Sequence, residues 1–464
     1  MQQVSSTSKP SKTETHFRLG VYAILTVGLI ASQLMVDLRP LVAQANGEGG
    51  SGGSRELTLD AQFRTRSEHW TNFGFGSGPE RDDTFVMGRI MLGADLRIGS
   101  HFRSYVQARS SFLTDRDLPG GKRASDADHL DLQNAFVDVV IPFEKTSSVA
   151  VRAGRQELLF GRQRLVSPWD WANTRRTFDG ARAILSTAGW KVHAFFVRPV
   201  LVEKSEFNSS DDNTDFFGVH ASHPVPTRGF EYDLYWLALD RASVSFNETT
   251  GHERRHTFGF RLNGNVQDTG WDYDGEVAYQ LGDVSDADIS AFMIGAVLGR
   301  TFSGTPTSPR LHIGFDTGSG DDAPGGDVGT FNQLFPLGHA YLGWIDLIGR
   351  QNVVAINSGV RLEPVQRLTI MLTGHRFWRA SDEDALYNAG GGVVRQPEPN
   401  GSKAVGSELD FLARYRFHPT LTGLVGYSRF FAGQFIEETG EDEDPQFFYL
   451  SLEWKPRKVE LLGD

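Results

Sequence analysis

The sequence of 464 residues contains no cysteine, which excludes a disulfide scaffold and any thiolate-bound zinc or iron–sulfur centre. It also has no excess of basic residues. The 46 Lys and Arg against 58 Asp and Glu give a net charge of −12, which argues against a nucleic-acid-binding protein. After the N-terminal segment, no uncharged run approaches the roughly 18 residues that a membrane-spanning helix needs. The rest of the chain is therefore not a helical membrane protein.

The N-terminus has the pattern of a secretory signal. Lys9, Lys12 and Arg18 precede an uncharged run over residues 19–36, and Ala43-Gln44-Ala45 provides a small-x-small cleavage site. We predict a signal peptide over residues 1–45, cleaved after Ala45, with an uncleaved anchor as the alternative. The Gly/Ser-rich residues 46–55 are predicted to be a flexible lead-in, and residues 56–464 a single barrel domain.

From residue 56 onward, apolar and polar side chains alternate with a period of two. The clearest runs are 57–64, 90–98, 257–263 and 408–417. Such alternation places one face of a strand in an apolar medium and the other in water. The runs extend over about 10 to 15 residues, whereas strands of soluble sandwiches usually have about 5 or 6. This length favours tilted strands that cross a bilayer.

The predicted fold is an all-β, single transmembrane antiparallel barrel of about 18 strands, an even number as in bacterial outer-membrane barrels. The strands are expected near residues 57–66, 84–98, 102–112, 130–141, 149–157, 176–187, 189–198, 214–222, 229–241, 254–265, 270–282, 286–302, 308–318, 350–363, 366–379, 404–418, 420–432 and 446–454. Short connections alternate with long polar ones at 67–83, 113–129, 158–175, 199–213, 319–349, 380–403 and 433–445. This pattern indicates short periplasmic turns and long external loops, with one short external connection near residues 282–285.

Strand parity also predicts which charged side chains face the lumen. The arginines that we expect to line a solute path are Arg64, Arg66, Arg89, Arg97, Arg103, Arg109, Arg152, Arg182, Arg361, Arg414 and Arg416. Acidic residues are concentrated on the opposite wall, between residues 229 and 282. Two interpretations stay open: ion pairs that stiffen the barrel, or a track of guanidinium groups for an anionic solute. If the arginines form such a track, we expect that replacing Arg66, Arg89 and Arg109 with glutamine lowers anion selectivity and leaves the fold intact.

Several motifs resemble the alginate export family of outer-membrane barrels. The clearest are VRAGRQEL (151–158), FGRQRLV (160–166), WDWAN (169–173) and RRTFDG (175–180). A second group comprises FD (315–316), SGDD (319–322), GTF (329–331), LFP (334–336) and QN (351–352). The resemblance implies an 18-stranded barrel in the outer membrane, with an arginine-rich, anion-selective pore partly occluded by loops. It implies passive export of an anionic, alginate-like polysaccharide, no cofactor, and contacts with outer-membrane lipid and a periplasmic scaffold of a synthesis complex.

Three other interpretations are considered. A porin for uptake of small organic anions has the same fold and the opposite flux. A barrel enzyme needs a nucleophile and base at one rim, and no G-x-S-x-G or P-loop motif occurs. Asp316, Asp321 and Asp322 are weak candidates for a loop-bound calcium ion, but they lack the spacing of a helix-flanked calcium loop. A solvated, turn-rich loop is the preferred interpretation of that segment.

Overall fold

The computed structural model describes residues 54–462. The predicted signal peptide and residues 46–53 of the predicted lead-in lie outside this range. Eighteen strands form a closed antiparallel barrel. They are β1 (Arg55–Thr71), β2 (Asp83–Ile98), β3 (Phe102–Leu113), β4 (Asp128–Glu144), β5 (Ser147–Gln156), β6 (Phe178–Thr187), β7 (Trp190–Leu201), β9 (Thr214–Val225), β10 (Phe230–Phe246), β11 (Thr249–Val266), β12 (Trp271–Val284), β13 (Ala287–Thr301), β14 (Arg310–Gly318), β15 (Val353–Val365), β16 (Leu368–Trp378), β19 (Ala404–His418), β20 (Leu421–Ala432) and β21 (Gln446–Trp454).

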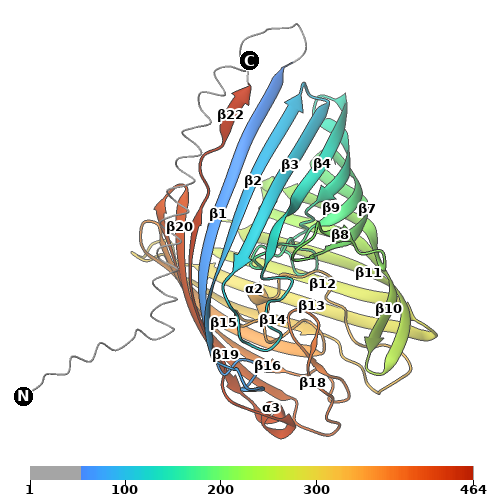
Figure 1. Cartoon of the computed structure of the whole chain (residues 1–464), viewed down its shortest axis with the longest axis vertical. Helices are drawn as coiled ribbons and strands as arrows, with labels where there is room; N and C mark the ends of the chain where they lie inside the picture. Colours follow the sequence, from blue (N-terminus) through green and yellow to red (C-terminus); the bar gives the residue numbers. More distant parts are fainter. Residues whose placement is uncertain (1–53, 463–464) are drawn as a thin grey trace, which may run out of the picture.

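Each strand pairs with its neighbours in chain order, and the ring closes where β1 pairs with both β2 and β21. The fold class predicted from alternation is confirmed, and every predicted strand overlaps one strand of the barrel. Three short strands lie outside the ring: β8 (Ser209–Ser210) pairs with β7, and β17 (Leu386–Tyr387) pairs with β18 (Val393–Arg395). After Trp454 the chain resumes pairing as β22 (Val459–Leu462), which lies beside the start of β1 (Figure 1).

The distribution of exposure is the reverse of that in a soluble protein. On β11, Phe258 and Phe260 are 49% and 41% exposed, whereas Thr257 and Arg261 are 1% and 3% exposed. Outward apolar side chains contact lipid, and closure of the ring gives the backbone groups of the spanning strands partners within the sheet. None of the helices in residues 54–462 is long and apolar enough to cross a bilayer.

The two ends of the barrel differ in their connections, as predicted. Short turns such as 99–101, 188–189 and 366–367 close the periplasmic end, and long loops leave the other end. The connection between β12 and β13 is short, as expected. The connection between β10 and β11 is also short, because both strands extend beyond the predicted ends and meet in a two-residue turn, Asn247-Glu248.

Two segments predicted to be external loops, 158–175 and 319–349, instead fold back into the barrel. Leu158, Phe160 and Leu165 pack with Phe178 and Phe216 of the wall. The second segment carries α2 (His339–Leu342), drawn inside the ring of strands in Figure 1, while α3 (Gln434–Thr439) lies at the external end. The apolar side chains of both segments lose contact with water by entering the lumen, which an external loop would not allow.

A closed barrel of this kind should unfold in detergent only when heated, because separating two paired strands leaves the backbone N–H and C=O groups of both strands without hydrogen-bond partners. We expect a sheet-dominated circular dichroism spectrum and a shift in gel mobility on boiling. A helix-dominated spectrum in detergent contradicts the fold.

Candidate permeation site

The first inner loop, residues 157–177, crosses the lumen and is held on one side by arginines of β1. Arg64 donates to the backbone carbonyls of Asp170 at 2.6 Å and of Ala172 at 2.9 Å. Arg66 donates to the carbonyl of Trp171 at 2.8 Å. Hydrogen bonds from charged donors are stronger than neutral ones, so this wall fixes the position of the loop.

Arg89 and Arg109 hold the same loop from β2 and β3, and both are buried, at 0% and 1% exposure. Arg89 donates to the Ala172 carbonyl at 3.0 Å and pairs with the Asp170 carboxylate. Arg109 pairs with Asp128 and donates to a carbonyl of the loop. Burial would raise the pKa of the Asp170 carboxyl, but the nearby arginines hold that pKa well below its usual range. Asp170 therefore stays ionised and keeps its pairing with Arg89.

The other end of the first inner loop reaches the acidic wall. Arg164 of the loop pairs with Asp274 and Glu276 of β12. Gly295 on β13 leaves room for this contact, since a Cβ there would lie 2.7 Å from Nε of Arg164. The segregation of basic and acidic residues around the wall thus has a structural use, because opposite walls bind opposite ends of one loop.

The second inner loop, residues 319–352, packs against the first. The amide of Phe335 donates to Leu165 at 2.8 Å, and the amide of Ser167 donates to Phe335 at 2.9 Å. Gly343, with φ +91°, approaches the wall so closely that a Cβ would lie 2.5 Å from the Glu408 carboxylate. This close approach places the following residue, Trp344, beside the first inner loop.

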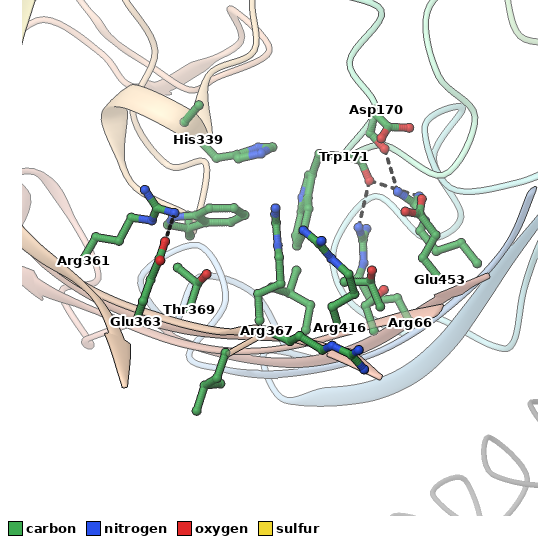
Figure 2. Close-up of a pocket in the computed structure, with 18 of the residues that line it drawn as sticks. Arg66, Asp170, Trp171, His339, Arg361, Glu363, Arg367, Thr369, Arg416 and Glu453 are labelled. Atoms are coloured by element: carbon green, nitrogen blue, oxygen red, sulfur yellow. Dashed lines mark hydrogen bonds and ion pairs between the residues drawn. The ribbon is translucent and has the colours of Figure 1, made fainter. Parts of the chain in front are cut away.

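Between the inner loops and the wall lies a cavity of about 910 Å³, which we call the basin. It is at the periplasmic end of the lumen, since the turns 302–309 and 366–367 border it. Seven cationic side chains line it, against three carboxylates. The cations are Arg64, Arg66, Arg361, Arg367, Arg414, Arg416 and Lys455, and the carboxylates are Asp170, Glu363 and Glu453 (Figure 2). The basin is thus electropositive in a chain of net negative charge.

Three aromatic side chains of the inner loops also line the basin. The ring centroids of Trp171 and Trp344 are 5.5 Å apart, and His339 lies 4.9 Å from the first and 4.7 Å from the second. The guanidinium of Arg66 stacks 3.9 Å from the ring centroid of Trp171. The basin therefore combines cationic groups of the wall with aromatic groups of the loops.

The eleven predicted arginines divide into four groups. Arg64, Arg66, Arg361, Arg414 and Arg416 line the basin, whereas Arg89 and Arg109 are buried against the first inner loop. Arg97 and Arg103 pair with Asp95, and Arg152 pairs with Asp138. Arg182 lies on β6 in register with Arg152 and is 8% exposed.

Parity of the strands did not identify the contribution of loops and turns to the basin. Asp170, Trp171, His339, Trp344, Arg367 and Lys455 all line it. A signal was present, because the motifs that resemble the family include 169–173 and 334–336 and lie mostly in segments predicted to be loops. A long loop rich in tryptophan, arginine and phenylalanine is a candidate for folding inward.

The three calcium candidates do not form a common site. Asp316 is fully buried and pairs with Arg350, and Asp321 is 4% exposed, whereas Asp322 is exposed. Within residues 54–462 no three potential metal ligands gather. The interpretation of this segment as a solvated loop is wrong for its buried first part and holds for residues 322–327.

The closed barrel, its apolar outer face and its charged interior define a porin-like protein of the outer membrane. The sequence matches the alginate export family model over residues 55–449, and the chain belongs to that family. No curated protein matches the sequence.

Solved outer-membrane proteins of Pseudomonas aeruginosa share the fold at low sequence identity. OccK8 (OprE) is 12% identical with a TM-score of 0.59, covering 88% of this chain and 98% of its own. OccD3 (OpdP) is 12% identical with a TM-score of 0.58, and the match covers 89% of this chain and 94% of OccD3. OpdK, solved with vanillate, is 10% identical with a TM-score of 0.56, and the match covers 87% of this chain and 99% of OpdK.

Proposed function

We propose that the protein passes an anionic exopolysaccharide outward through the outer membrane by passive diffusion, without catalysis. The observation that carries the proposal is the excess of cations in the basin, seven against three carboxylates. Guanidinium groups bind carboxylates through paired hydrogen bonds. Several neighbouring groups of this kind allow a repeating polyanion to exchange one contact for the next as it moves.

The distribution of charge between the two ends supports outward passage. Beside the basin, the segment after Trp454 contributes Lys455, Arg457 and Lys458, all exposed at the periplasmic end. At the external end, the loop 433–445 contains six carboxylates and no basic residue. A field of this shape raises the local concentration of a polyanion at the periplasmic mouth and lowers it outside. Entry from the periplasm is therefore favoured.

Uptake of a small organic anion is the second candidate function. It is favoured by the size of the basin, because about 910 Å³ is within the range of single-ligand pockets. The first inner loop, fixed at both walls, also narrows the path available to a polymer. OpdK, which has the same fold, was solved with vanillate.

Reconstitution in planar bilayers tests the proposal. We expect a reversal potential that shows anion selectivity, because the charge lining the pore affects permeation more than distant loop charge. An oligouronate should block the current at lower concentration from the periplasmic side than from the external side. Cation selectivity contradicts anion passage, and stronger block from the external side favours uptake over export.

A further inference from the structure

The aromatic residues of the basin form one cluster that is rigidly supported from behind. Tyr449 of β21 is 1% exposed, and its ring centroid lies 5.0 Å from Trp171 and 6.1 Å from Trp344. Trp171 is also fixed by the hydrogen bond from Arg66 to its carbonyl. Both indoles therefore have defined positions at the edge of the basin, although they come from different loops.

The cations with no acidic partner lie on the wall of the same cavity. Figure 2 shows Arg416 of β19 and Arg367 of the turn 366–367 on the side of the wall, with His339 and Trp171 on the side of the loops. Arg367, Arg414 and Arg416 are exposed, and none of them forms an ion pair within residues 54–462. Their guanidinium groups are available to a carboxylate that enters the basin.

We propose that Trp171 and Trp344, whose ring planes lie at 78° to each other with His339 beside both, form an aromatic platform. The ring of a cyclic carboxylate packs there against the face of one indole and the edge of the other, while Arg414 and Arg416 hold its carboxylate group. This inference rests on the proposed function and adds a ligand class, a carboxylate carried on a six-membered ring. A pyranose or an arene presents a flat, weakly polar face that covers an indole and displaces water from it. An open-chain acid of the same charge satisfies the arginines and leaves the indoles uncovered.

Three monovalent acids test the platform by their block of single-channel current: glucuronate, benzoate and open-chain gluconate. We expect glucuronate to bind about tenfold more tightly than gluconate. Benzoate distinguishes the source of the ring. Preference for glucuronate over benzoate assigns the platform to sugar acids, and the reverse order assigns it to aromatic acids. Both orders support the proposal. Equal affinity for all three acids overturns it.

Variants separate stacking from charge. Trp344→Leu and Trp171→Leu keep an apolar side chain and remove the flat ring, so the preference for ring acids over gluconate should fall toward unity. Trp344→Phe should retain much of the preference. Trp271→Leu, on the outer wall, is the control and should leave the preference intact. If the leucine variants fold and keep the full preference, the platform is refuted, whereas cation selectivity of the unaltered protein refutes the proposed function itself.

Discussion

Replacing Arg367, Arg414 and Arg416 together with glutamate should turn the channel from anion-selective to cation-selective. Each replacement changes the charge of the basin by two, so the excess of four positive charges becomes an excess of two negative ones. All three side chains are exposed to the basin, so the fold should be retained. The reversal potential under a salt gradient should change sign, because the charge lining a pore sets the local concentration of each ion.

A matched control reverses the same number of charges at the same end of the barrel. Lys145 and Arg228 on other periplasmic turns and Lys191 at the periplasmic start of β7 are exposed and do not line the basin. Their replacement with glutamate changes the net charge of the chain equally and should leave the sign of the reversal potential unchanged. If the control alters selectivity as much as the basin variant does, permeation is governed by total charge at the mouth, and the basin is not the selective site.

Replacing Arg64 and Arg89 with glutamine should release the first inner loop and increase the unit conductance. Together the two guanidinium groups hold the Asp170 and Ala172 carbonyls and the Asp170 carboxylate. Hydrogen bonds from charged groups contribute about 1.5–3 kcal/mol each, so losing several of them should loosen this segment even though the hydrogen bonds from Arg66 and Arg109 remain. Single-channel recording measures the conductance, and hydrogen exchange over residues 168–174 measures the loosening of the loop.

Arg103→Gln is the control for this second prediction. Arg103 pairs with Asp95 of the wall and, within residues 54–462, forms no hydrogen bond or ion pair with the first inner loop. Its replacement should leave the conductance unchanged. If Arg64→Gln with Arg89→Gln lowers anion selectivity at constant conductance, the two arginines act as pore charges and not as supports of the loop.

The structure changes what is expected of the triple glutamine variant proposed from the sequence. Arg89 and Arg109 do not face open water, because the first inner loop covers them. Replacing Arg66, Arg89 and Arg109 together with glutamine removes supports of the first inner loop. The variant should therefore differ from the unaltered protein in conductance and stability as well as in selectivity. Strand parity identified the inward direction of these side chains and not what they contact there.

The sequence by itself determined the barrel. Alternation with a period of two depends only on neighbouring residues and on which medium each face contacts, so runs such as 257–263 specify spanning strands without knowledge of the rest of the chain. The lengths of the connections distinguished the two ends, and parity directed Arg361, Arg414 and Arg416 to the lumen, where they line the basin.

Only the tertiary structure decided where the long loops lie. Trp171 and Trp344 are 173 positions apart in the chain, and no local pattern relates them. The contact between the two indoles depends on Arg64 and Arg66 binding backbone carbonyls of the first inner loop. Because every residue has a backbone carbonyl, the sequence does not show which carbonyls accept these hydrogen bonds. These contacts decide which lumen arginines support a loop, which line the basin and which, like Arg64 and Arg66, do both. This division is a property of the closed barrel and not of any one strand.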